Sequence, residues 1–248
     1  MTVTWEEAGW ERLAAGVGRC RLPGWDCTVG LVVGEGSALM IDAGSGLAEG
    51  ARLRAEAQAL AGHAVTHLAL THPHFDHVFG AAEFADAEVF GAVGVERVLT
   101  DEREALRGDA VENGLHARVA DEAVAALAHP RHLAFVAVPD EWTLSLGGDR
   151  QVLLVNAGPG HTSHDLAVVV QGVPGSPPVV FCGDLVEESG DPQAGPDAVP
   201  SHWPAALDRL LGLGGEDALY VPGHGAVVDA GFVRAQRDAL ATRFGVSR

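Results

Sequence analysis

The predicted strands of this sequence come in runs, and that grouping limits the fold more than any other feature. Short segments rich in Val, Leu and Ala, bounded by Gly, Pro and Asp, are typical of buried strands. They cover residues 27–33, 38–41, 65–70, 88–90, 134–138, 143–146, 151–155, 166–170, 179–182 and 218–221. Helical composition is found at residues 47–61, 77–85, 95–129, 203–213 and 231–244, with breaks expected near Gly108 and Gly114. Because every sheet must bury an apolar face, this order favours two sheets packed face to face with helices outside them.

Length and net charge limit the domain organisation of the chain and the kinds of partner it can bind. The chain has 248 residues and no internal repeat, which favours one domain over residues 1–248 with a helical insertion or cap at about 95–130. The formal net charge is −18, and the sequence contains no Lys. Such an acidic surface repels phosphate backbones and anionic lipids, so we expect no nucleic acid and no membrane as partner.

The N-terminal residues and the cysteines indicate the cellular compartment in which the protein is expected. Residues 1–12, MTVTWEEAGWER, lack the basic start and apolar stretch of an export signal. No apolar run reaches the length of a membrane span. The three cysteines, Cys20, Cys27 and Cys182, are odd in number and have no scaffold spacing. We therefore expect a cytoplasmic protein with reduced cysteines, and a Cys20–Cys27 pair is the alternative.

A dense group of metal-binding residue types follows the predicted strand at residues 65–70. The sequence there is His72-Pro73-His74-Phe75-Asp76-His77, with three imidazoles and a carboxylate within six residues. This donor set suits zinc or a similar divalent ion. Asp76 and His77 are adjacent, so their side chains diverge and are better placed for a second ion than for the first. The alternative is a surface cluster of histidines that matches the pattern by chance.

Two ions need more donors than this run supplies, and three further candidates share one setting. His161, Asp184 and His224 each stand beside a glycine just after a predicted strand. Glycine lets the backbone approach a crowded centre. Taken singly, each of the three is typical of a polar turn residue, and only their common placement gives them weight.

Together these motifs resemble those of the metallo-β-lactamase fold superfamily. The resemblance covers about residues 27–228 and lies in the order of the motifs as well as in their residues. In chain order the motifs are Asp42 in Ile-Asp-Ala-Gly, Thr71-His72-Pro-His74-Phe-Asp76-His77, Gly160-His161-Thr162, Gly183-Asp184 and Gly223-His224-Gly225. The resemblance implies the α/β (α+β) class and a four-layer αββα sandwich of two mixed β-sheets flanked by helices.

The resemblance also implies a role for each matched residue. His72, His74 and His161 would hold a first ion, Asp76, His77 and His224 a second, and Asp184 would bridge the two. Asp42 would order the ligand loops from the outer shell. Zinc is the first expectation for both ions, with iron or manganese as alternatives.

The expected chemistry is hydrolysis by a metal-bridging hydroxide. Two ions acidify a shared water and polarise the substrate oxygen, so the hydroxide attacks a carbonyl or phosphorus centre. Asp76 and Asp184 would be catalytic, since they partly neutralise the ions and position the nucleophile. The sequence has no Gly-x-Ser-x-Gly elbow.

Two residues outside the ligand set are candidates for the substrate pocket. His164 stands where the family commonly has a small residue, and Trp203 follows the Pro-rich loop at residues 186–201. A hydrogen-bonded or surface histidine and an ordinary core tryptophan are the alternatives. Cys182 is expected to pack in the core as a small apolar residue.

The leading hypothesis is therefore a cytoplasmic hydrolase of a small ester, lactone or thioester, with a small molecule as partner and a homodimer left open. Only about one predicted helix follows His224, so the helical glutathione-binding domain of glyoxalase II-like enzymes is not expected. A mononuclear iron oxidoreductase resembling persulfide dioxygenases is the second hypothesis. A non-catalytic metal- or ligand-binding module is the third.

Overall fold

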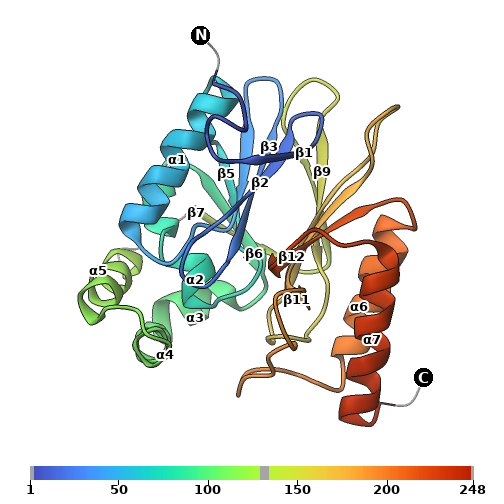
Figure 1. Ribbon diagram of the computed structural model, residues 1–248. Coiled ribbons are helices and arrows are strands. Elements are labelled where there is room, and N and C mark those ends of the chain that lie inside the picture. The colour runs from blue at the N-terminus through green and yellow to red at the C-terminus, as the bar shows by residue number, and fades with distance from the viewer. Residues whose placement is uncertain (1–2, 129–133, 247–248) are drawn as a thin grey trace.

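Two β-sheets pack face to face between two layers of helices. A computed structural model describes residues 3–128 and 134–246. One sheet has seven strands in the order β1-β2-β3-β4-β5-β6-β7, and the other has five in the order β12-β11-β10-β9-β8. Helix α1 and helices α3 to α5 lie outside the first sheet, and α6 and α7 lie outside the second (Figure 1). The predicted αββα sandwich is confirmed.

The elements have the following bounds. The seven-stranded sheet contains β1 (Glu11–Ala14), β2 (Val17–Arg21), β3 (Thr28–Val33), β4 (Ala38–Ile41), β5 (His67–Ala69), β6 (Glu88–Ala92) and β7 (Ala134–Val138). The five-stranded sheet contains β8 (Glu141–Ser145), β9 (Gln151–Asn156), β10 (Leu166–Val170), β11 (Val179–Glu187) and β12 (Leu219–His224). The helices are α1 (Leu47–Ala61), α2 (Phe75–Val78), the 3₁₀ helix η1 (Ala81–Phe84), α3 (Val95–Asp101), α4 (Arg103–Glu112), α5 (Ala117–Leu127), α6 (Trp203–Gly214) and α7 (Ala230–Phe244).

Both sheets are mixed, as predicted. Strands β1 to β4 pair antiparallel, whereas β4, β5, β6 and β7 run parallel to one another. In the second sheet, β11 and β12 are parallel and the remaining pairs are antiparallel. Parallel neighbours end at the same edge of a sheet, so the segments that follow β4 and β5 emerge close together.

The core has two parts because the five-stranded sheet is covered on both faces. Strand β10 shows this directly, since all five of its residues are buried. Leu166, Val168 and Val170 face the core between the sheets, while Ala167 and Val169 face the core beneath α6 and α7. Alternate side chains of a strand point to opposite faces, so a strand buried on both sides reads as an unbroken apolar run.

The N-terminal strands β1 and β2 were not predicted from the sequence. Strand β2 contains Arg19, which reads as a surface residue but is buried. Its guanidinium donates to the Glu11 carboxylate at 2.7 Å and to the Gly225 carbonyl oxygen at 2.8 Å. A buried cation is tolerated when it is paired in this way, and the sequence gives no sign of these partners.

Two predicted helices differ from those observed. The helix expected over residues 77–85 is divided into α2 and η1 at Gly80, where a Cβ atom would lie 2.1 Å from the Ala43 carbonyl oxygen. The break expected near Gly108 is wrong, because Gly108 lies inside α4. The chain breaks instead at Glu102, and again around Gly114 as expected. Helices α3 to α5 fill the segment predicted as a cap, whose last residues, 129 and 130, lie outside the described residues.

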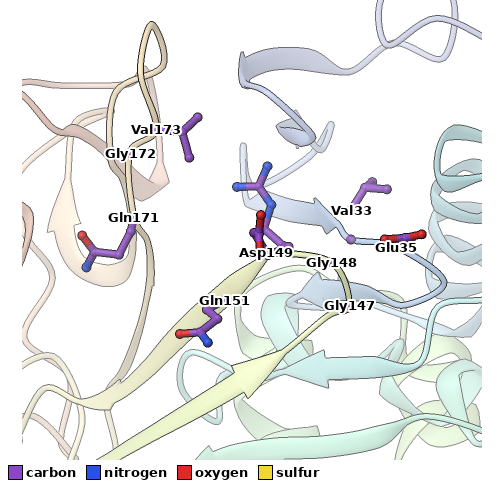
Figure 2. Close-up of a pocket in the computed structure, with 11 residues that line it drawn as sticks. Val33, Glu35, Gly147, Gly148, Asp149, Gln151, Gln171, Gly172 and Val173 are labelled. Atoms are coloured by element: carbon purple, nitrogen blue, oxygen red, sulfur yellow. The ribbon is translucent and has the colours of Figure 1, made fainter.

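The end of the sandwich opposite the segments after β4 and β5 carries a shallow groove of about 540 Å³ (Figure 2). The β3–β4, β8–β9 and β10–β11 connections line it, and none of the predicted site residues does. Within residues 3–128 and 134–246, helices that combine enough length and apolar character to cross a bilayer are absent.

Candidate metal centre

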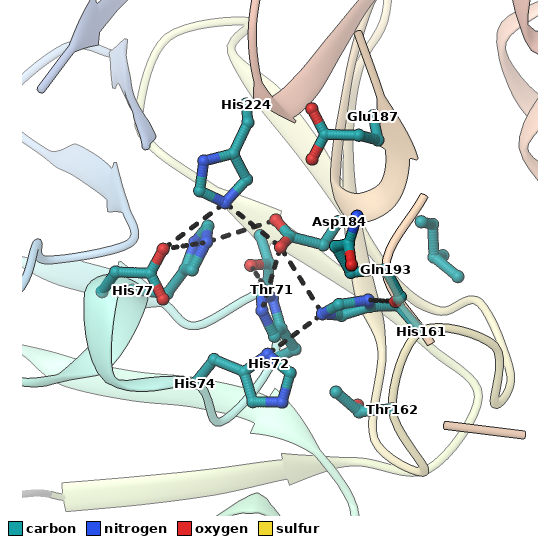
Figure 3. Close-up of polar contacts among 12 residues, drawn as sticks. Thr71, His72, His74, His77, His161, Thr162, Asp184, Glu187, Gln193 and His224 are labelled. Carbon is teal, nitrogen blue, oxygen red and sulfur yellow. Dashed lines mark hydrogen bonds and ion pairs between the residues drawn. The ribbon is translucent and has the colours of Figure 1, made fainter. Parts of the chain in front are cut away.

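The predicted ligands meet at one edge of the sandwich, where segments from both sheets end (Figure 3). His72 and His74 follow β5, and Asp76 and His77 lie on α2. From the other sheet come three residues, namely His161 in the β9–β10 connection, Asp184 within β11 and His224 at the end of β12. Strands β11 and β12 are longer than predicted, so Asp184 and His224 belong to strands rather than to the loops after them.

Three imidazoles and one carboxylate form the first group of donors. His161 Nε2 lies 3.0 Å from His74 Nδ1, and Asp184 Oδ2 lies 3.4 Å from His161 Nε2 and 3.7 Å from His72 Nε2. One donor atom from each of the four residues falls within 4.8 Å of all the others. This spacing is compact enough for one ion to contact all four.

The second group shares Asp184 with the first. His77 Nε2 lies 3.2 Å from Asp184 Oδ1, and His224 Nε2 lies 3.2 Å from Asp184 Oδ2. Asp76 Oδ2 is 3.6 Å from His77 Nε2 and 3.4 Å from His224 Nε2. The two groups therefore share the Asp184 carboxylate, the residue that the resemblance implies would bridge two ions.

The donor set fits divalent cations. His72 Nε2 and Asp184 Oδ1 are buried and have no hydrogen-bond partner among the described residues. Such groups are costly to bury unless something else satisfies them. Gly223 keeps room for this carboxylate, because a Cβ atom there would lie 1.8 Å from Asp184 Oδ1. The imidazole and carboxylate donors match zinc and, less selectively, iron or manganese.

Asp42 supports both groups from the outside, as the resemblance implied. Its Oδ2 lies 2.8 Å from His77 Nδ1, and the Thr71 backbone N–H and hydroxyl both donate to the carboxylate at 2.8 Å. The Thr71 hydroxyl also contacts His72 Nδ1 at 3.0 Å. Asp42 has a left-handed φ of 59°, an uncommon backbone conformation for a residue other than glycine. These contacts fix the ring orientation of His72 and His77.

The remaining imidazoles are held by residues that the sequence did not reveal. His74 Nε2 contacts Asp197 Oδ2 at 3.0 Å. Burial disfavours the charged form of His74, but the hydrogen bond to Asp197 outweighs burial and raises the His74 pKa. His161 Nδ1 donates to the Gln193 carbonyl oxygen at 3.0 Å, and His224 Nδ1 donates to that of Trp25 at 2.7 Å. Backbone carbonyls have no sequence signature, and Asp197 is one of several acidic residues in its loop.

The two groups differ in the pKa values of their imidazoles. Burial lowers the pKa of His161 to about 4, and burial together with the charge of His77 holds the pKa of His72 well below its usual value. Burial acts in the same direction on His224, but the Asp184 carboxylate outweighs it and raises that pKa to about 9. Burial also opposes the charge of His77, and the acidic groups around it raise its pKa well above the usual value.

Cys27 is a neighbour of the second group that the sequence did not indicate. Its Sγ lies 3.6 Å from His77 Nδ1 and 3.7 Å from His77 Nε2, and it donates to the Asp76 carbonyl oxygen at 3.3 Å. Nearly equal distances to both ring nitrogens mean that the sulfur packs over the face of the imidazole. Burial raises the pKa of this thiol, so it stays protonated in the metal-free protein. The described cysteines are all free, so Cys20 and Cys27 are not paired.

A cavity of about 630 Å³ opens over both groups. His164 lines it, beside His161 and Ser163. Trp203 does not, because it is fully buried behind His161, with ring centroids 5.6 Å apart and its Nε1 donating to the Leu185 carbonyl oxygen at 2.9 Å. The core alternative considered for Trp203 matches this placement, and so does the core position expected for Cys182.

An αββα sandwich with His and Asp donors gathered at one edge defines a class of metal-binding α/β proteins. This chain belongs to the metallo-beta-lactamase superfamily, whose family model matches residues 22–224. No match to the sequence was found among curated proteins.

Solved structures share the fold at low sequence identity. The metallo-beta-lactamase FIM-1 from Pseudomonas aeruginosa in its mono-zinc form is 18% identical, with 96% of each chain covered and a TM-score of 0.66. A metallo beta lactamase from Hirschia baltica is 17% identical, with 93% of this chain and 96% of that chain covered and a TM-score of 0.65. A metallo-beta-lactamase from Pontibacter korlensis is 20% identical, with 93% and 97% covered and a TM-score of 0.63.

Proposed function

We propose that this chain is a binuclear metal-dependent hydrolase of a small ester, lactone or thioester. The observation that carries the proposal is the convergence of seven His and Asp side chains, five of which line one open cavity. Zinc is the proposed metal, with iron or manganese as alternatives. The solved neighbours named as metallo-beta-lactamases support a hydrolytic use of the fold but not a particular substrate.

Two divalent ions would supply Lewis acidity and make water a better nucleophile near neutral pH. His72, His74, His161, Asp76, His77, His224 and Asp184 would hold them. The carboxylates of Asp76 and Asp184 line the cavity, so they can accept a hydrogen bond from the attacking water and fix its direction. His164 lines the same cavity and is placed to contact the bound substrate.

The first test is the metal content of protein purified without added metal, followed by turnover on esters, lactones, thioesters, phosphoesters and a β-lactam. We expect about two zinc ions per chain and hydrolysis of at least one carbonyl substrate. Asp184→Asn should lose both the second ion and the activity. His202→Ala alters an exposed histidine outside the cavity and should change neither.

The alternatives give different results in the same experiment. One iron per chain, with oxygen consumption in the presence of a persulfide, would favour the iron oxidoreductase. Two bound ions with no turnover on any substrate class would argue against a hydrolase. Activity that is unchanged in Asp184→Asn would show that the metal centre is not responsible for it.

A further inference from the structure

The wall of the cavity is acidic. Five carboxylates line it among the described residues, and none of the described lining residues is an Arg, while the chain has no Lys. The five are Asp76, Glu102, Asp109, Asp184 and Asp197. Apart from the imidazoles that line it, a substrate that carries a carboxylate or phosphate would therefore meet no cationic side chain on these walls.

Four of these carboxylates already have a cationic or metal-binding partner. Asp76 and Asp184 belong to the ligand groups. Asp197 is paired with His74 at 3.0 Å, and Glu102 is paired with Arg97 at 3.3 Å. Asp109 is the exception, since its only polar side-chain contact among the described residues is a neutral one, with the Asn113 amide donating to Oδ1 at 3.1 Å.

Asp109 lies beside an aromatic wall. The Trp25 indole donates to the Asn113 carbonyl oxygen at 3.3 Å, and Asn113 in turn contacts Asp109, so one residue connects the indole and the carboxylate. Trp25 also packs edge-on against Phe75, with ring centroids 5.2 Å apart. Trp25, Phe75, Asp109 and Asn113 all line the cavity.

An unpaired carboxylate next to aromatic rings is complementary to an organic cation. The carboxylate offers its charge, and the electron-rich face of an indole attracts ammonium groups. Helix α4, which carries Asp109, packs against α2, which carries Asp76 and His77. The aromatic and acidic wall is therefore adjacent to the metal centre but separate from its ligand groups.

We infer that Asp109, Trp25 and Phe75 form a subsite for an ammonium group, and that the substrate is an ester or lactone carrying such a group. This inference rests on the proposed hydrolase function for its reaction, but binding of the cation does not depend on turnover. The scissile carbonyl would lie over the ligand groups while the ammonium group lies against α4.

The test compares two esters of the same shape on the metal-loaded protein. Acetylcholine carries a trimethylammonium group, and 3,3-dimethylbutyl acetate carries an uncharged tert-butyl group in its place. We expect kcat/KM to favour acetylcholine, and the variant Asp109→Asn to reduce that preference by about three- to tenfold, the effect of one partly exposed charge. Trp25→Leu should reduce it by about threefold through loss of the cation–π contact.

The control is Glu112→Gln, which removes the same charge from the same helix but does not line the cavity. It should leave the preference unchanged. An equal preference in wild type and Asp109→Asn would overturn the inference, as would an equal loss in Glu112→Gln. Asp109→Lys should go further and reverse the preference.

A binding experiment separates this inference from the proposed function. If neither ester is hydrolysed, calorimetry with choline and 3,3-dimethylbutanol on the same protein still reports the subsite. Tighter binding of choline that is lost in Asp109→Asn would support the subsite while the ester hydrolysis fails. Equal binding of both alcohols, or binding of choline unaffected by Asp109→Asn, would overturn the subsite.

Discussion

The two donor groups of the candidate metal centre each have an imidazole–carboxylate contact, but one contact is buried and the other is partly exposed. In the His77–Asp42 pair the side chains are 0% and 2% exposed, whereas in the His74–Asp197 pair they are 23% and 43% exposed. The first pair is part of the sandwich core, and the second depends on a loop that lies across the edge. One half of the site is thus formed by folding itself, and the other is completed by a surface segment.

Asp184 belongs to both halves, so its replacement should have the largest effect. Asp184→Asn keeps the shape of the side chain but removes the charge that two groups of imidazoles face. We expect the protein to retain at most one ion and to lose about a hundredfold or more in activity. Elemental analysis and steady-state kinetics check this. Two retained ions would contradict the bridging position.

Proton competition should separate the two halves by pH. His224, with a pKa of about 9, and His77, whose pKa is also raised, are protonated at neutral pH in the metal-free protein. His161, with a pKa of about 4, is already neutral, as is His72. A metal ion competes with a proton only at an imidazole that is protonated before the ion binds. The His72 and His161 half should therefore load first as pH rises.

Calorimetry at pH 6 and pH 8.5, in two buffers of different ionisation enthalpy, measures this difference. Affinity for the second ion should rise by up to about a hundredfold per pH unit below 9, with release of one proton from His224 and one from His77. Affinity for the first ion should change less, and mainly through His74, whose pKa is raised. Two ions with the same dependence on pH would contradict the difference between the halves.

Replacing the buried carboxylate of the core half should affect stability as well as metal binding. Asp42 accepts hydrogen bonds from both the backbone and the hydroxyl of Thr71, and an amide offers only one acceptor oxygen. We expect Asp42→Asn to destabilise the protein by about 3 kcal/mol even without metal, the cost of breaking a buried polar network. Thermal denaturation in a chelator measures this. An unchanged melting temperature would mean that the core half does not depend on Asp42.

The corresponding change in the loop half should be the mildest. Asp197→Asn removes the charge that orients His74, and we expect about tenfold weaker binding of one ion. The stability of the metal-free protein should change little, because an exposed pair contributes little to folding. Asp191→Asn is the matched control in the same loop and should leave both properties unchanged. If Asp197→Asn destabilised the metal-free protein as much as Asp42→Asn, the two carboxylates would not differ in their contribution to folding.

The sequence predicted the His and Asp side chains that the structure brings together, but not the groups that hold them in place, and the reason is physical. Metal ligands come from a few residue types, here His and Asp, and these are visible in the sequence at positions such as His161 and His224. The outer nitrogens of those two rings are held by carbonyl oxygens of Gln193 and Trp25. Any residue can supply a carbonyl, so only the folded backbone reveals them.

The fold was predictable where local pattern and tertiary packing agree. Helix α1 matches its predicted bounds because its composition, rich in Ala, Leu, Glu and Arg, has a high helix propensity. Strand β2 was missed because the buried Arg19 is satisfied by contacts with Glu11 and Gly225, the second of which lies far along the chain. Similarly, the extension of β11 to Glu187 follows from its pairing with β12, which local composition does not record.

The candidate ligand groups draw on both sheets, so ions bound there would also link the two halves of the chain. His72 and His77 come from the N-terminal half of the chain, Asp184 and His224 from the C-terminal half, and the Trp25 carbonyl already ties the first half to the second. Bound ions would form a cross-link between the two sheets at this edge of the sandwich. With ions bound, the N-terminal and C-terminal halves of the chain would unfold together under force or in denaturant. After removal of the ions by a chelator, one half could unfold before the other.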